Sequence, residues 1–290
     1  MASANVNGIT IEYETEGSGE PLLLVMGLGE QLTSWPAEFV GLLVDAGFQV
    51  IRFDNRDIGL STEFEWEPPS AARAVAQTMV RRPPKTGYHL ADMAADAAAL
   101  LDELAVGPAH VVGVSMGGMI AQTMAIEHPA HVRSLTSIMS NTGDRKYGKV
   151  AAKLLPKVAR LGDNTRENAV ERAVTINRLI SGPGFDADER RSLAEHNLER
   201  SFRPDGVARQ TAAIMASPDR TPGLGGVAAP TLVIHGLLDP LVKPSGGVAT
   251  ARAVPGSRLI MYPDMGHDLP RQRWPEIVDE IRRHANRPAG

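Results

Sequence analysis

The sequence contains no cysteine. Disulfide bonds, thiolate nucleophiles and thiolate metal sites are therefore excluded. Positive charge is not in excess either, because 30 Lys and Arg residues stand against 34 Asp and Glu residues and the formal net charge is −4. Such a chain has no basic field to attract a phosphate backbone, so we expect no nucleic acid partner.

Long apolar segments and cofactor motifs are also missing. No apolar run reaches the roughly 18 residues of a membrane span, and residues 1–10 have neither part of a secretory signal, so a cytoplasmic location is expected. The sequence has no H-E-x-x-H, no G-x-x-x-x-G-K-[ST] and no strand-linked G-x-G-x-x-G. We therefore expect neither a metal ion nor an organic cofactor.

The 290 residues, 43% of them apolar, are enough to bury a sizeable core. Asn7-Gly8 between two alternating segments predicts a hairpin near the start. Short continuous apolar runs follow, and they predict strands buried on both faces, as in a parallel sheet. These runs cover residues 22–26, 50–53, 110–114, 135–139, 231–234 and 259–262.

Helical patterns separate most of these strands, over residues 36–46, 90–104 and 115–128. Pro36 fits a first helical position. The alternation of strand and helix predicts an α/β fold with a mostly parallel, doubly wound sheet. Residues 63–87, which are rich in Pro and Arg, are ambiguous between a loop and one short helix.

The alternation stops between residues 141 and 228, where only helical patterns occur. They cover residues 150–160 with an interruption at Pro156, and residues 166–180, 187–201 and 207–216. Asp186 followed by Glu189 is typical of a helix N-terminus. The sequence therefore predicts a core made of residues 1–140 and 229–290, with residues 141–228 inserted as a helical cap.

The motif G-V-S-M-G at residues 113–117 lies between a predicted strand and a predicted helix. A nucleophile at such a turn has a strained backbone, and small residues two positions before and after it let strand and helix approach. The turn also directs the amide of Met116 toward an anion that forms beside Ser115. The alternative is a packing turn in which the serine only caps the helix.

A serine hydroxyl needs a base to take its proton and an acceptor to orient that base. His267 follows the last predicted strand in a turn-like segment, and we assign it as the base. Asp239 follows the preceding strand and is assigned as the acid, with Asp264 and Asp268 as substitutes. Five of the other histidines are expected at the surface: His89, His128, His131, His196 and His284. His110 opens a predicted strand and His235 ends one, so both are expected to be structural.

The order Ser115, Asp239, His267 is that of the α/β-hydrolases, which the chain resembles over nearly its whole length. The segment L-V-M-G-L-G at residues 24–29, followed by Trp35-Pro36, is similar to the aclacinomycin methylesterase-like carboxylesterases, as is G-V-S-M-G. The resemblance implies an α/β-hydrolase fold. It also implies that the backbone N–H groups of Leu28 and Met116 form the oxyanion hole.

Two positions depart from the family pattern. Many relatives carry His-Gly where this chain has Met26-Gly27, so a side chain that often braces the loop is absent. Asp57 replaces the glycine that is usual in the segment D-x-R-G-x-G-x-S at residues 54–61. The loop around residue 57 is therefore expected to differ from that of relatives.

These residues predict a serine hydrolase that cleaves small-molecule carboxylic esters through an acyl-enzyme. The same triad supports perhydrolysis, lactone opening or C–C bond hydrolysis, and a ligand receptor with slow turnover is a further alternative. Six apolar residues either line the substrate pocket or simply pack in the core: Met139, Leu179, Ile180, Phe185, Ile214 and Met215. The natural substrate and the oligomeric state are not readable from the sequence.

Overall fold

The computed structural model describes residues 1–69 and 83–287. Its eight-stranded sheet has the order β1-β2-β4-β3-β5-β6-β7-β8. The strands are β1 (Ala2–Val6), β2 (Ile9–Glu16), β3 (Glu20–Val25), β4 (Phe48–Phe53), β5 (Ala109–Val114), β6 (Val132–Ile138), β7 (Thr231–Gly236) and β8 (Arg258–Tyr262). Strand β2 is antiparallel to β1 and β4, and the remaining neighbours are parallel. The predicted mostly parallel sheet is confirmed.

The first two strands form the predicted hairpin. Asn7 and Gly8 connect them with φ angles of 49° and 77°, and Val6 pairs with Ile9 across the turn. Two consecutive positive φ angles belong to a type I′ turn, whose twist matches that of the flanking strands.

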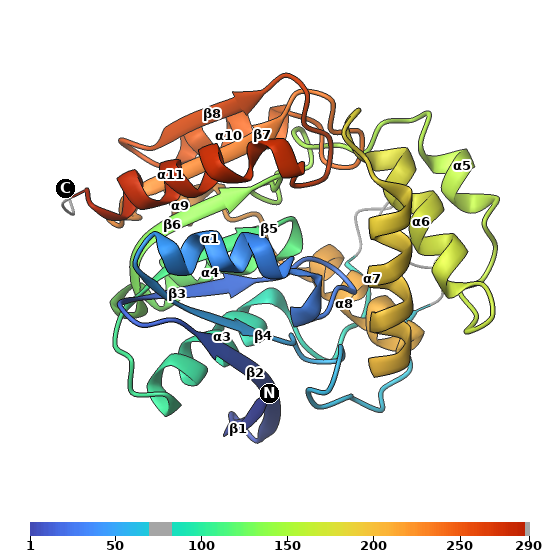
Figure 1. Cartoon of the computed structure of the whole chain (residues 1–290), viewed down its shortest axis with the longest axis horizontal. Helices are drawn as coiled ribbons and strands as arrows, with labels where there is room; N and C mark the ends of the chain where they lie inside the picture. Colours follow the sequence, from blue (N-terminus) through green and yellow to red (C-terminus); the bar gives the residue numbers. More distant parts are fainter. Residues whose placement is uncertain (70–82, 288–290) are drawn as a thin grey trace.

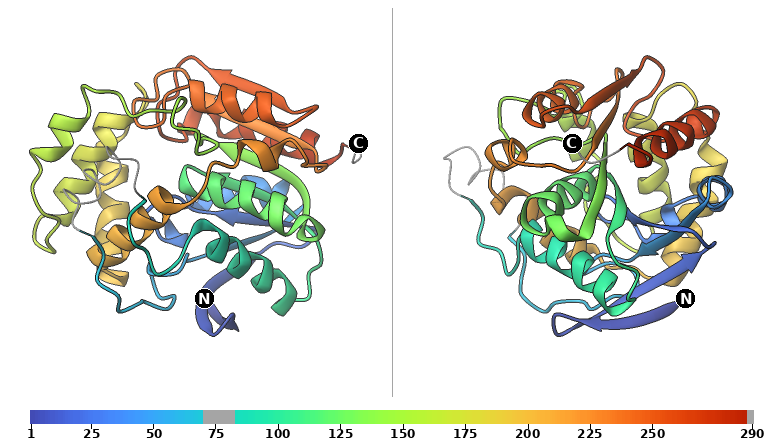
Figure 2. Two further views of the ribbon diagram at one scale, coloured as in Figure 1. Left: turned by 180° about the vertical axis from the view of Figure 1, so that it is seen from behind. Right: turned by 90° about the vertical axis from the view of Figure 1, so that its left-hand side faces the viewer.

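Helices cover both faces of the sheet (Figures 1 and 2). They are α1 (Ala37–Asp45), α3 (Leu90–Glu103), α4 (Met116–Glu127), α10 (Ser245–Ala253) and α11 (Trp274–Ala285), with short 3₁₀ turns at Leu32–Ser34, Pro129–His131 and Arg271–Arg273. Leu22 and Leu24 of β3 belong to a core cluster with α1 and α11, whereas Leu23 and Val25 belong to one with α3 and α4. Successive side chains of a strand point to opposite faces, so β3 serves both cores.

Five helices and no strand lie between β6 and β7, a part of the chain that the structure describes throughout. They are α5 (Leu155–Ala159), α6 (Ala169–Ile180), α7 (Ala187–Arg200), α8 (Pro204–Ala216) and α9 (Thr221–Leu224). Helices α5 to α8 gather beyond one end of the sheet (Figure 1). We call residues 141–228 the cap segment, and its boundaries stay a prediction.

Several helix boundaries differ from those predicted. Helix α5 begins at Leu155, so Pro156 lies in its first turn and does not interrupt a longer helix. Helix α8 begins at Pro204, three residues before the predicted start. Proline suits a first turn because its missing N–H would have no intrahelical acceptor there. Asp186 caps α7 as predicted, with its carboxylate accepting hydrogen bonds from two backbone amides.

Part of the ambiguous segment 63–87 lies outside the described residues, since residues 70–82 are not described. The described remainder contains no helix or strand. Across residues 1–69 and 83–287, each helix is too short or too polar to cross a bilayer.

A buried histidine lies near the start of β5. His110 is only 3% exposed, and its Nδ1 atom is 2.8 Å from the hydroxyl oxygen of Ser134. Burial, reinforced by the positive charge of Arg133, lowers the pKa of His110 from 6.5 to about 4, although Glu20 acts in the opposite direction. His110 is therefore neutral in the folded protein near neutral pH.

This shift predicts that the fold loses stability in acid. Between pH 6.5 and about 4 the unfolded chain binds a proton at His110 that the folded chain does not, so stability falls as pH falls through that window. We expect a loss of about 2 kcal/mol after allowance for solvent screening. His110→Gln should remove this part of the pH dependence in urea unfolding at pH 7 and pH 4. Replacing the exposed His196 by Gln is the control, and an equal response of both variants would contradict the assignment.

Candidate active site

Ser115 occupies the turn between β5 and α4, where the motif predicts it. Its φ of 54° lies in the left-handed region that few side chains adopt. A Cβ atom added to Gly113 would lie 2.1 Å from the carbonyl oxygen of Gly117, and one added to Gly117 would lie 2.0 Å from that of Val25. Gly113 therefore lets β5 and α4 meet at this turn, and Gly117 lets α4 approach the end of β3.

His267 reaches Ser115 from the loop that follows β8. Its Nε2 atom is 2.9 Å from Oγ of Ser115, a distance at which the imidazole can accept the hydroxyl proton. The backbone N–H of His267 donates to the carbonyl of Ile180 at the end of α6, over 2.7 Å. The loop that carries the imidazole is thus attached to the cap segment.

Asp239 lies on the other side of the imidazole. Its Oδ2 atom is 2.7 Å from Nδ1 of His267, and its Oδ1 accepts hydrogen bonds from the amides of Leu241 and Val242. Burial opposes ionisation of this carboxyl, but the charge of His267 and hydrogen bonds from its neighbours outweigh it and hold the pKa of Asp239 below its ordinary value. The carboxylate is therefore ionised and fixed.

The two substitute carboxylates have other partners. Asp264 pairs with Arg273 over 3.1 Å, and Asp268 accepts hydrogen bonds from the amides of Gly266 and Gly182. The structure thus brings Ser115, Asp239 and His267 together and engages Asp264 and Asp268 elsewhere.

His235 and His284 are buried, as is His110. His235 is fully buried beside the acid: its Nε2 donates to the carbonyl of Val242 over 2.7 Å and lies 3.4 Å from Oδ2 of Asp239. His284 was expected to be exposed, and that expectation is wrong, because α11 turns it inward and leaves it 3% exposed.

Residues 27–31, which we call the oxyanion loop, lie against the nucleophile. A Cβ added to Gly27 would be 3.3 Å from Cβ of Ser115, and the amide of Glu30 donates to the carbonyl of Gly27 to close a turn. Within the described chain, the N–H groups of Leu28 and Met116 have no hydrogen-bond acceptor. Both predicted oxyanion donors are therefore free to bind an anion.

A cavity of about 590 Å³ opens onto Ser115 and His267. Most of its wall is apolar and comes from both the core and the cap segment: Trp35, Val114, Leu154, Ile176, Leu198 and Val207. Of the six apolar residues considered from the sequence, Met139 and Ile180 line it; Leu179, Phe185, Ile214 and Met215 do not.

One wall of the cavity is polar, and the sequence analysis did not predict it. Glu30 pairs with Arg190 of α7 over 2.6 Å and accepts a hydrogen bond from Ser34. Burial opposes the charge of Glu30, but Arg190 and Ser34 outweigh it and lower the pKa of the carboxyl. Because Glu30 and Arg190 are 160 residues apart in the sequence, no local pattern predicts that they pair.

Asp57, the second departure from the family pattern, joins the core to α8. Its φ of 72° lies in the region that glycine adopts most easily. The buried carboxylate accepts hydrogen bonds from Nε of Arg209 at 2.9 Å, the Tyr88 hydroxyl at 2.6 Å and the amide of Phe64 at 2.8 Å. Burial and the charge of Asp57 raise the pKa of Tyr88, so its hydroxyl stays a donor.

We predict that Asp57→Asn destabilises the protein by about 3 kcal/mol, because the buried guanidinium of Arg209 then keeps only the partly exposed Glu63 as a charged partner. Urea unfolding measures this loss. Glu63→Gln is the control, since Glu63 pairs with the same arginine over 3.0 Å but is 44% exposed, and should change stability by less than about 1 kcal/mol. Equal losses in the two variants would show that the buried pair has no special weight.

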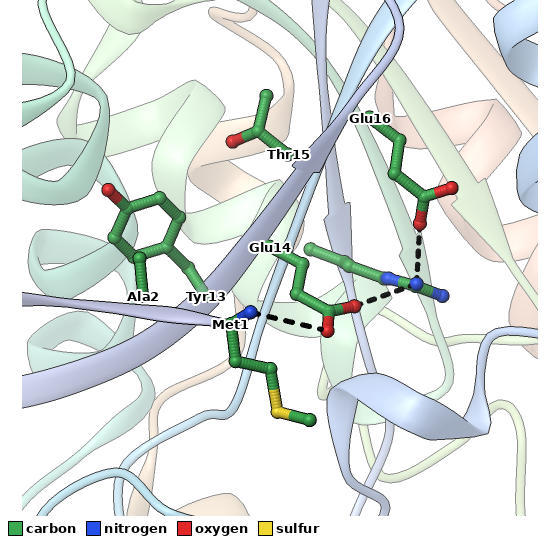
Figure 3. A pocket seen from close by; sticks show the side chains of 7 residues that line it. Met1, Ala2, Tyr13, Glu14, Thr15 and Glu16 are labelled. Carbon is green, nitrogen blue, oxygen red and sulfur yellow. Dashed lines mark hydrogen bonds and ion pairs between the residues drawn. The ribbon is translucent and has the colours of Figure 1, made fainter.

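A second hollow, at the edge formed by β1, β2 and β4, offers less chemistry (Figure 3). There Arg52 pairs with Glu14 over 2.7 Å and with Glu16, and the N-terminal ammonium of Met1 also lies near Glu14, so two positive charges balance two negative ones. Among residues 1–69 and 83–287, no three His, Asp or Glu side chains are grouped to hold a metal ion. The absence of a cofactor stays a prediction.

Comparison with known proteins identifies the family. A family model described as the alpha/beta hydrolase fold matches residues 20–270. The chain therefore belongs to the α/β-hydrolase family. Its relatives further define it as a hydrolase of the esterase type: a rhodomycin D methylesterase from Streptomyces peucetius is 33% identical, over 93% of this chain and 93% of the relative. The resemblance to methylesterase-like enzymes predicted from the sequence is confirmed.

Other matches are more distant in sequence. A protein provisionally named a non-heme bromoperoxidase from Mycobacterium tuberculosis is 29% identical, over 89% of this chain and 91% of its own length. Among solved structures, an enol-lactonase from Burkholderia xenovorans has a TM-score of 0.73 at 21% identity and covers 99% of this chain and 100% of its own. This structural likeness shows the shared fold.

Proposed function

We propose that the protein is a serine esterase that hydrolyses small-molecule carboxylic esters through an acyl-enzyme. The observation that carries the proposal is the hydrogen-bonded chain of Asp239, His267 and Ser115, with distances of 2.7 and 2.9 Å. This chain opens into the 590 Å³ cavity, and small-molecule pockets commonly have volumes of this order.

In the first step, Oγ of Ser115 attacks the ester carbonyl while Nε2 of His267 takes the hydroxyl proton. The carbonyl oxygen becomes an oxyanion, which accepts hydrogen bonds from the amides of Leu28 and Met116. Each such donor contributes about 3–4 kcal/mol in comparable enzymes. Collapse of the intermediate breaks the bond to the alkoxy oxygen, and His267 returns its proton to the departing alcohol.

In the second step, water attacks the acyl-serine. His267 accepts a proton from the water, the same two amides stabilise the new oxyanion, and the proton then passes to Oγ as the carboxylic acid leaves. Asp239 keeps the imidazole in the tautomer with Nδ1 protonated and stabilises the imidazolium in both steps. Atoms balance as ester plus water giving acid plus alcohol, without a cofactor.

For the substrate, we propose methyl esters of bulky, mainly apolar acids. The apolar wall of the cavity suits such an acid, and the relative from Streptomyces peucetius is named for methylester cleavage. The polar wall at Glu30 and Arg190 suits an acid that also carries hydroxyl or carbonyl groups.

Perhydrolysis is a second candidate function, because one relative is provisionally named a non-heme bromoperoxidase. In that reaction hydrogen peroxide replaces water as the second nucleophile and the acyl group leaves as a peracid. Product analysis with and without peroxide separates the two, because an esterase forms the carboxylic acid at an undiminished rate when peroxide is absent.

The cytoplasmic location and the lack of a nucleic acid partner also remain proposals.

Substitution of the triad tests the proposed function. Ser115→Ala should abolish turnover of p-nitrophenyl butyrate, and Asp239→Asn should lower kcat by about three to four orders of magnitude because the imidazole loses its orienting acceptor.

Asp264→Asn provides the matched control, because it removes a carboxylate that is near in sequence but pairs with Arg273. It should retain most of the activity. Folding of every variant is checked by thermal unfolding. Near-normal turnover by folded Ser115→Ala would overturn the mechanism, and a lack of turnover of any ester by the unmodified protein would favour the ligand receptor.

A further inference from the structure

The oxyanion loop is held from the cap segment. Gly29 is the third residue of the turn closed by the hydrogen bond from Glu30 to Gly27, and its φ of 72° is what a type II turn requires at that position. The amide of Gly29 donates to Oε1 of Gln210, on α8, over 3.0 Å. These two residues are separated by 181 positions in the sequence.

Gln210 has a second partner that fixes its orientation. Its Nε2 donates to the carbonyl of Arg56 over 2.9 Å, so the oxygen and the nitrogen of the side-chain amide are each matched to one backbone group. The side chain is fully buried. It therefore spans from the oxyanion loop to the neighbouring core loop with both polar atoms satisfied.

The ends of the turn have supports in the core. Asn55 donates to the carbonyl of Met26 over 3.1 Å, and Asp54 accepts from the amide of Leu32 over 2.7 Å. The central peptide of the turn, between Leu28 and Gly29, is held by Gln210 instead. Helix α8 also packs directly on this peptide, since a Cβ added to Gly29 would lie 3.0 Å from the side chain of Val207.

We propose that Gln210 is a positioning residue for the oxyanion loop. This inference rests on the proposed function, because it assigns the amide of Leu28 to the oxyanion. The peptide planes on either side of Leu28 share its Cα atom. Holding the Gly29 amide therefore restricts the direction in which the Leu28 amide points, and preorganised donors of this kind act chiefly on the transition state.

Gln210→Met tests the proposal, because methionine has a similar length and removes both hydrogen bonds. We expect kcat for p-nitrophenyl butyrate to fall by about ten- to a hundredfold while KM changes less than about threefold. Gln210→Glu keeps an acceptor for the Gly29 amide and should recover part of kcat. Glu63→Gln is the matched control, since it weakens a contact between the cap segment and the core without touching the oxyanion loop.

Inhibitor binding gives a readout that a general loss of packing would not produce. The carbonyl of a trifluoromethyl ketone is attacked by Oγ of Ser115 and becomes an oxyanion, whereas the corresponding methyl ketone binds largely without this addition. Gln210→Met should lower the affinity for the trifluoromethyl ketone by the same factor as it lowers kcat. The affinity for the methyl ketone should stay nearly unchanged. Equal weakening of both ketones, or a kcat like that of Glu63→Gln, would overturn the proposal.

Hydrogen exchange separates this inference from the proposed function. The amides of residues 27–31 should exchange faster in Gln210→Met than in the unmodified protein, whether or not any ester is cleaved. Unchanged exchange rates would refute the positioning role of Gln210 even if the protein is an active esterase. If exchange is faster in Gln210→Met but the unmodified protein cleaves no ester, the positioning role stands and the proposed esterase function is wrong. Thermal unfolding identifies folded variants, and Gln210→Glu carries the test if Gln210→Met does not fold.

Discussion

The close approach of β5 and α4 is the constraint on which the site depends. Gly113 has no side chain to keep β5 and α4 apart at the turn where Ser115 adopts a positive φ, and Gly117 lets α4 approach the end of β3. The turn places the first amide of α4 next to Ser115, and the oxyanion loop lies against the same residue. The loops that follow β7 and β8 bring Asp239 and His267 to Ser115 at the carboxyl ends of the parallel strands, where open α/β folds commonly bind ligands.

A second organising feature is the charge distribution between the cap segment and the core. Arginines on α7 and α8 pair with carboxylates of the core. The pairs Arg200–Asp54 and Arg209–Asp57 are buried, and the pair Arg190–Glu30 is partly buried. Burying a charge is unfavourable unless its partner is well placed, so such pairs penalise alternative positions of the cap segment. They specify one arrangement more than they add stability.

Local patterns were enough to predict the sheet, its main helices and the residues that meet around Ser115. Strands such as β5 are largely apolar, and Gly113 has a steric purpose within the motif itself, since a Cβ there would meet the backbone of Gly117. Helix α9 was missed because four residues containing Pro222 and Gly223 have no amphipathic period. The Gln210 contact was out of reach because it joins residues that only the tertiary fold brings together.

The helices inserted between β6 and β7 hold the loop of His267 through Ile180, and they hold the loop of Leu28 through Arg190 and Gln210. Grafting the insertion of another hydrolase into this scaffold would therefore alter the positions of both loops as well as the shape of the pocket. A chimera designed to change substrate preference would need these contacts rebuilt along with the new helices.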